Sequence, residues 1–420
     1  MSDNRDFLEN LNKESEVSHF AYPCVGSASS PPPNGLGLNP PQRRQIGRSA
    51  MEAASMLCRG SISPADSGPA APTGQHRLPE VRPSGLSQPL SRKEVPMSLA
   101  LRNVRDDVAS NTTNIGSLVV GWKPQHAALW GRAPVCVSHN LRTSSLFDRT
   151  ALASLIERYP RKHYSIIHMG PRSEDHRFWR EGELGGMPGH DVIDAIENGR
   201  LWLNLRHVGD VDGRYAAVVN ALFDELEVLA PGFTTKARGC GIIISSPNAE
   251  VYYHADLPGH ALLQLIGRKR IFFYPPNPPF ITPEELERIA IFGLEVGIPY
   301  SAWFDEYSSV FEFEPGQMIH WPHTAPHRIE NYDCLNVSVT LDFVTPEIRR
   351  RQMVILANGI MRHRFGWAAR DTSTKGPSFW AKAVLQRTMR NTRWMNQQRA
   401  SARKIQFRLD RAAPGCVADV

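Results

Sequence analysis

Between residues 251 and 343 the chain consists largely of short apolar runs separated by glycine and proline. The runs cover 251–256, 261–266, 271–274, 310–313, 318–321, 327–331 and 336–343. Runs this short, rich in β-branched and aromatic residues and bounded by turn formers, indicate strands rather than helices. Many short strands at close spacing predict a β-sandwich or jelly roll.

Helical patterns flank these strands. We expect amphipathic helices before them at 147–158, 191–197 and 215–229, and further strands at 164–169, 201–206 and 241–246. The insertion 275–309 contains a predicted helix at 283–292. It could cover the mouth of a site or serve as an ordinary crossover on one sheet. After the last strand, Thr345 and Pro346 predict the cap and first residue of a helix to about residue 365.

The first apolar run carries His254 and, two residues later, Asp256. Side chains at i and i+2 of a strand point to the same side, so both can reach one metal ion. A third ligand must then come from another strand, and His327 begins one, 73 residues after His254. Two histidines and a carboxylate can hold Fe(II) on one face of an octahedron and leave the opposite face open. His320 and His323 lie in the same segment and are the alternatives to His327.

The tripeptide alone is a weak signal. With 15 histidines in the chain, about one His-x-Asp or His-x-Glu is expected by chance. The order of the segments around the tripeptide is the stronger evidence for a metal site. The His-x-Asp strand is followed by a Gly267-Arg268-Lys269 turn and an apolar strand ending in proline, and later by a glycine, an apolar strand, proline and His327.

In this order, residues 120 to 345 resemble the cupin-like, JmjC-type branch of the Fe(II)- and 2-oxoglutarate-dependent oxygenases. The resemblance implies a mainly β fold, a double-stranded β-helix with flanking helices and further helices after the barrel. It implies that His254, Asp256 and His327 bind Fe(II), and that Lys269 pairs with the distal carboxylate of the cosubstrate 2-oxoglutarate. The expected activity is hydroxylation or demethylation of a protein side chain, an RNA base or a small molecule.

Several positions depart from the family's pattern. His260 stands where asparagine is common, and Val251 stands where many members have a threonine that helps to bind the cosubstrate. These departures keep a second hypothesis open, in which the barrel is a regulatory or interaction module without oxygenase activity. Fold alone does not decide between them, because barrels of this type carry many functions.

Charge is distributed unevenly. The net charge is +6, but residues 346–420 contain 16 Lys/Arg against 4 Asp/Glu, so the rest of the chain carries −6. A basic C-terminal region, which we expect to be helical through about residue 410, can contact nucleic acid or an acidic partner. It can also be a solvated helix face. The resemblance further implies a homodimer held by these helices.

The sequence predicts three regions. Residues 1–115, rich in Pro, Ser and Gly at 27–41 and 61–96, are expected to be disordered, with a short helix possible at 48–58. Residues 116–345 form the barrel domain and residues 346–420 the basic helical region. The six cysteines show no Cys-x-x-Cys pair, and no apolar run is long enough to span a membrane. We therefore expect a cytoplasmic protein without a membrane segment.

Overall fold

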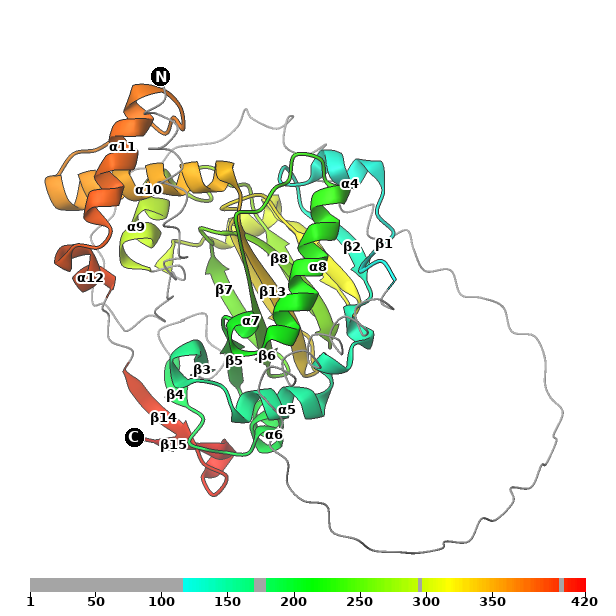
Figure 1. Cartoon of the computed structure of the whole chain (residues 1–420). Coiled ribbons are helices and arrows are strands. Elements are labelled where there is room, and N and C mark those ends of the chain that lie inside the picture. The colour runs from blue at the N-terminus through cyan, green and yellow to red at the C-terminus, as the bar shows by residue number, and fades with distance from the viewer. Residues whose placement is uncertain (1–115, 170–178, 294–296, 400–403) are drawn as a thin grey trace, which may run out of the picture. The chain divides into compact units, whose positions relative to one another are not determined.

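A computed structural model describes residues 116–169, 179–293, 297–399 and 404–420. The region 1–115, including the helix considered at 48–58, lies outside the described residues. Figure 1 shows two sheets with helices against them. None of the described helices is both long and apolar enough to cross a membrane.

Eight strands form the barrel. Four lie in the smaller sheet, in the order β10 (Ser309–Phe313), β9 (Lys269–Phe273), β12 (His327–Asn331) and β7 (Glu250–His254). The other four lie in the larger sheet, in the order β11 (Gln317–His320), β8 (Gly259–Ile266), β13 (Asn336–Val344) and β6 (Ala237–Ser245). All pairs within these groups are antiparallel.

Along the chain these strands pass back and forth between the two sheets. β6, β8, β11 and β13 belong to one sheet, and β7, β9, β10 and β12 to the other. This alternation is that of a double-stranded β-helix, and the predicted fold is thus confirmed. The apolar side chains between the sheets form one cluster: Leu262, Ile271, Phe273, Phe311, Phe313, Ile319, Trp321 and Ala325.

Further strands widen the larger sheet on both sides. Beyond β11 lie β2 (Val135–His139) and β1 (Val119–Val120). Beyond β6 lie β5 (Leu201–Leu205), β3 (Tyr164–His168), β4 (Arg180–Glu183), β14 (Ile405–Leu409) and β15 (Val417–Asp419). The sequence patterns indicated β3, β5 and β6 but not β1, β2 or β4, which are short or lack clear alternation.

The expectation that the C-terminal region is helical to about residue 410 is wrong at its end. Residues 405–409 form strand β14, which runs parallel to β4, and β15 pairs with it as a hairpin. Apolar residues alternate here with polar ones, and Phe407 is fully buried. Its ring fills the space over Gly182, where an added Cβ would lie 2.4 Å from the ring. The period of two in Ile405, Phe407 and Leu409 is the strand signal that the basic composition obscured.

Helices cover the outer face of the larger sheet. These are α4 (Pro124–Leu129), α5 (Arg149–Glu157), α6 (Gly189–Asn198), α7 (Val208–Val211) and α8 (Gly213–Leu229). Figure 1 shows α8 lying over the barrel strands of this sheet. There Phe223 of α8 meets Phe343 of β13 edge to face, with ring centroids 5.9 Å apart. Asp148 caps α5 by accepting a hydrogen bond from the Ala151 amide.

The helices after the barrel are α10 (Pro346–Phe365), α11 (Gly376–Met389) and α12 (Arg393–Arg399). α9 (Pro283–Phe292), which has the predicted bounds, packs on α10. At this crossing a Cβ on Gly359 would lie 2.9 Å from Ile291 and 3.0 Å from the Glu287 carbonyl. The insertion 275–309 therefore packs against the C-terminal helices through α9. Short 3-10 turns occupy Leu141–Thr143, Ser145–Phe147, Arg161–His163, Ala302–Tyr307 and Pro414–Cys416.

Candidate metal centre

The fold brings His254, Asp256 and His327 together. His254 ends β7 and His327 begins β12, and the two residues face each other across this strand pair. Their ring centroids are 4.1 Å apart. The Nε2 of His327 lies 3.4 Å from a carboxylate oxygen of Asp256. One ligand atom from each of the three residues lies within 4.8 Å of the others, so the group could hold one metal ion.

Backbone carbonyls orient both imidazoles. The Nδ1 of His254 lies 2.7 Å from the Tyr252 carbonyl, and the Nδ1 of His327 lies 3.1 Å from the Ala325 carbonyl. A carbonyl only accepts hydrogen bonds, so each Nδ1 carries the proton. Each Nε2 then keeps its lone pair for a metal, which is how metal-binding histidines are usually held.

The protonation states suit metal binding. Burial, and then the nearby His254, lower the pKa of His327 to about 3. Burial alone would raise the pKa of Asp256, but the neighbouring His260, His327 and His254 outweigh it and lower that pKa. At neutral pH the site therefore offers a neutral imidazole at His327 and an ionised carboxylate. These are the forms that bind divalent metals.

The two alternatives to His327 lie outside this group. His320 donates from Nδ1 to the His260 carbonyl at 2.7 Å, and its ring lies 4.2 Å from that of Trp130. His323 uses Nε2 on the Leu257 carbonyl at 2.6 Å. Burial lowers the pKa of each to about 4. Each therefore uses a ring nitrogen on a backbone carbonyl outside the metal group, and the geometry favours His327 as the third ligand.

Sequence reasoning missed the place of His260 in the site. Its Nδ1 lies 3.0 Å from a carboxylate oxygen of Asp342, and its Nε2 lies 3.8 Å from Asp256. Burial opposes protonation, but these two carboxylates raise the pKa of His260 to about 9. A protonated His260 therefore lies next to Asp256, the acidic residue of the candidate metal site. The pairing of His260 with Asp342 across β8 and β13 appears only once the strands are in register.

Lys269 lies inside the barrel at the start of β9 and is only 3% exposed. Its ammonium donates to the Ser338 hydroxyl at 2.8 Å. Among the described residues no carboxylate forms an ion pair with it. Burial accordingly lowers the pKa of Lys269 to about 7. A buried ammonium without a counter-ion is costly, and it creates a strong preference for an anionic ligand.

A polar network fixes the lysine. The Ser338 hydroxyl donates to the Gln264 side-chain oxygen at 2.7 Å, and the Gln264 amide donates to Asn336 at 2.7 Å. These three side chains are fully buried between the sheets. The sequence patterns did not single them out, because one polar residue within an apolar strand has no signal of its own. The network leaves the Lys269 ammonium one fixed position.

Aromatic rings line the barrel next to the metal ligands. Trp321 lies 4.8 Å from the ring of His327, and Phe273 lies 5.1 Å from Trp321. Trp321 and Phe273 are both buried. Such a wall keeps water away from one side of a bound metal and strengthens the electrostatic interactions there.

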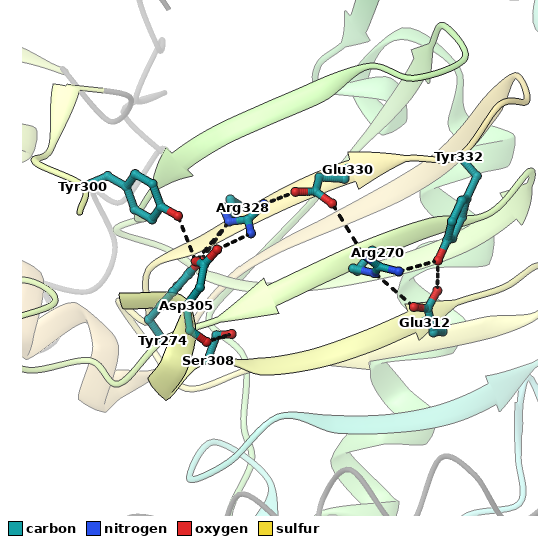
Figure 2. Close-up of polar contacts among 9 residues, drawn as sticks. All are labelled: Arg270, Tyr274, Tyr300, Asp305, Ser308, Glu312, Arg328, Glu330 and Tyr332. Atoms are coloured by element: carbon teal, nitrogen blue, oxygen red, sulfur yellow. Dashed lines mark hydrogen bonds and ion pairs between the residues drawn. The ribbon is translucent and has the colours of Figure 1, made fainter. Parts of the chain in front are cut away.

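On the outer face of the smaller sheet, a polar network holds the strand that carries His327 (Figure 2). The next residue, Arg328, donates to Asp305 at 2.7 Å and to the Tyr274 hydroxyl at 2.9 Å, and it also pairs with Glu330. Its guanidinium lies 3.4 Å from the centre of the Phe272 ring. β12 is thereby tied to β9 and to the 3-10 turn at Ala302–Tyr307.

Neither protein-family models nor curated proteins match this sequence. Among solved structures, YcfD of Escherichia coli is similar at 16% identity, over 67% of this chain and 71% of that chain, with a TM-score of 0.40. A second structure shows YcfD, described as a ribosomal oxygenase, in complex with cobalt and 2-oxoglutarate. It matches at 16% identity over 71% of this chain and 76% of that chain, with a TM-score of 0.38. The DMSP lyase DddQ of Ruegeria pomeroyi matches at 13% identity over 26% of this chain and 40% of that chain, with a TM-score of 0.17. Similarity of this degree leaves function to be argued from the chain's own residues.

Proposed function

We propose that this protein is an Fe(II)- and 2-oxoglutarate-dependent oxygenase, acting as a hydroxylase or a demethylase. The observation that carries the proposal is the pairing of two features inside one barrel. One is the group formed by His254, Asp256 and His327. The other is Lys269, a buried ammonium for which the described residues supply no carboxylate. The first suits a metal and the second suits an anion.

The strand register relates the two features. β9 and β12 are neighbours, with His327 opposite Phe273 and Asn331 opposite Lys269. Four residues along a strand span about 13 Å. A ligand that contacts both a metal near His327 and the Lys269 ammonium must therefore be short. An anionic group at each end suits the metal at one end and the ammonium at the other. 2-Oxoglutarate has this form, and its keto and near carboxylate oxygens can chelate the metal.

Each residue then has a defined task. His254, Asp256 and His327 would hold Fe(II), and Lys269 would neutralise and orient the far carboxylate of 2-oxoglutarate. Trp321 and Phe273 keep water from one side. The bound metal and cosubstrate supply oxygen activation for C–H hydroxylation, which on an N-methyl group releases formaldehyde and so removes the methyl group. The same chemistry serves a protein side chain, an RNA base or a small molecule as substrate.

Anaerobic titration of the protein with Fe(II) and 2-oxoglutarate tests this function. The chelate gives a visible charge-transfer band. We expect the band in the wild type, its loss in His327→Ala, and a weakened 2-oxoglutarate affinity in Lys269→Ala. In air, the wild type should convert 2-oxoglutarate slowly to succinate even without substrate, and His254→Ala should not. Absence of the band from folded wild-type protein would overturn the proposal.

The same experiment separates the oxygenase from a regulatory or interaction module without oxygenase activity. The cation at His260, 3.8 Å from Asp256, favours this second candidate because it opposes metal binding. A module of this kind would give neither the 2-oxoglutarate band nor succinate.

We also propose that the protein acts in the cytoplasm as a homodimer. Among the described cysteines, Cys240, Cys334 and Cys416 are free thiols, and free thiols suit a reducing compartment. The homodimer rests on the family resemblance alone. Sedimentation of the full chain at micromolar concentration tests it, and a monomer at that concentration would contradict it.

A further inference from the structure

The helices after the barrel concentrate positive charge. Residues 346–399 contain twelve arginines and lysines and two acidic residues. They are Arg349, Arg350, Arg351, Arg362, Arg364, Arg370, Lys375, Lys382, Arg387, Arg390, Arg393 and Arg399, against Glu347 and Asp371. The oxygenase site uses none of them. Such an excess of positive charge on one group of helices attracts a polyanion.

Both acidic residues are already paired within this region. Glu347 pairs with Arg351 at 2.9 Å, and Asp371 pairs with Lys382 at 3.3 Å. Arg362 pairs with the acids of α9 instead. Across the described part of the chain, no carboxylate forms an ion pair with Arg349, Arg350, Arg364, Arg370 or Arg390. The surplus charge is therefore not neutralised from within the fold.

Two of these arginines lie near enough for their charges to interact, and no carboxylate of the described residues pairs with either of them. Arg349, near the start of α10, is partly buried, and Arg390 follows the end of α11. Burial, and then the charge of Arg390, lower the pKa of Arg349. The Nε of Arg390 is buried and has no hydrogen-bond partner. Two neighbouring guanidinium charges and an N–H group without a hydrogen-bond partner favour the binding of an anion with several oxygens, such as a phosphate.

Aromatic rings are exposed on the same helices. Trp367 is 69% exposed, Phe365 49% and Trp380 39%. Arginines stack on them: Arg364 lies 6.0 Å from the centre of the Phe365 ring, and Arg350 lies 6.0 Å from that of Trp380. Exposed rings interleaved with arginines present flat apolar faces beside positive charge.

We propose that α10, α11, α12 and the segment 366–375 form a docking surface for single-stranded nucleic acid. Arginines neutralise its phosphates, and Trp367, Phe365 and Trp380 stack on its bases. Exposed rings beside arginines also suit protein interfaces, but the repeated arginines without an acidic partner match the repeated phosphates of a strand. A second copy of this chain brings the same positive charge, so a homodimer held by these helices must leave Arg364, Arg370 and Trp367 outside its interface. A duplex would meet the charge while keeping its bases stacked on one another. The proposal does not depend on the oxygenase function, since none of these residues belongs to that site.

Fluorescence anisotropy of the full chain with labelled poly(U) RNA of about 20 nucleotides tests the surface. We expect affinity to fall steeply with salt, because each neutralised phosphate releases counterions. Single-stranded DNA of the same length should bind comparably, and duplex DNA more weakly. Charge reversal in Arg364→Glu/Arg370→Glu should lower the RNA affinity by at least about tenfold.

Two matched controls keep the test specific. Arg132→Glu/Lys162→Glu makes the same change in net charge at exposed positions outside the surface, and it should leave affinity within about twofold. Trp367→Ala, at unchanged charge, should weaken binding about tenfold. Trp303→Ala removes a tryptophan that is 47% exposed elsewhere and should have no such effect. Equal losses in the test and control variants, tighter binding of duplex than of single strands, or no salt-dependent binding at all would overturn the proposal.

Discussion

At the residue scale, three histidines within one short segment have different roles. His320 and His327 are buried, and His323 is half-buried. His320 and His323 each donate to a carbonyl outside the metal group. Only His327 directs a free Nε2 toward Asp256, because it begins the strand that pairs with the end of β7. The metal site is therefore selected by strand register rather than by the identity of the side chain.

His327→Ala should lower Co(II) affinity by at least about 100-fold, since it removes one of three ligands. His323→Gln is the control, because it alters a half-buried histidine in the same segment that lies outside the metal group. We expect it to keep Co(II) affinity within a few-fold. Visible absorption of the anaerobic Co(II) protein measures both. A larger loss in His323→Gln than in His327→Ala would show that the third ligand is wrongly assigned.

Lys269→Met should stabilise the fold while removing 2-oxoglutarate binding. The folded-state pKa of about 7 lies below the ordinary lysine value of 10.5. The unfolded chain therefore binds more protons between these two pH values, so wild-type stability rises with pH across this window. We expect the variant to be more stable by on the order of 2 kcal/mol at pH 7. Its advantage should shrink as the pH rises toward 10.5 and vanish well above it, where the lysine is neutral in both states.

Urea denaturation at pH 7 and at pH 9.5 checks this prediction. For the wild type, the affinity for 2-oxoglutarate should also fall as the pH rises above about 7, because the free protein then loses the Lys269 proton. Isothermal titration over the same range measures it. A wild-type affinity that rises through this range would show that Lys269 does not bind the cosubstrate.

At the element scale, β12 carries the proposed metal ligand His327 on its inner face, and on its outer face the contacts of Arg328 act as a clamp. Arg328, the residue after His327, ties the strand to Asp305 and Tyr274 (Figure 2). Side chains of successive strand residues point to opposite faces. The clamp can therefore fix the backbone at His327 without entering the site.

Arg328→Met should cost about 1–3 kcal/mol of stability and weaken Co(II) binding by about tenfold, because it leaves Asp305 without its cation and frees the backbone at His327. Arg270→Met is the matched control. Arg270 lies on the same face and pairs with Glu312 at 3.0 Å, but it is more exposed. It should cost less than about 1 kcal/mol. Equal effects on Co(II) binding would argue against a positioning role for Arg328.

At the scale of the whole molecule, ligands that bind only the folded state must raise its stability. At a concentration 100 times the dissociation constant, a ligand adds about 2.7 kcal/mol. We expect Co(II) and then 2-oxoglutarate to raise the melting temperature in two steps. In Lys269→Met the first step should persist and the second should vanish. Differential scanning fluorimetry separates them, and a full second step in the variant would exclude Lys269 as the anion site.

The sequence by itself determined the order of the barrel strands, the bounds of α9 and α10, and the placing of His254 and Asp256 on one side of a strand. It did so because these features are local or periodic. Strand alternation, the Thr345-Pro346 start of α10 and the His-x-Asp spacing are each written within a few residues. The β14 strand carried such a signal too, and the prediction of a helix there gave more weight to charge than to period.

Only the tertiary structure decided which groups share an environment. It placed His260 between Asp256 and Asp342 and chose His327 over His320 and His323. It also buried Lys269 beside Ser338, where no carboxylate of the described residues pairs with it. Each of these facts depends on residues that lie far apart in the chain and meet through strand register. Burial and Coulomb interaction act through space, so the pKa of a side chain follows from its neighbours in the fold rather than from its neighbours in the sequence.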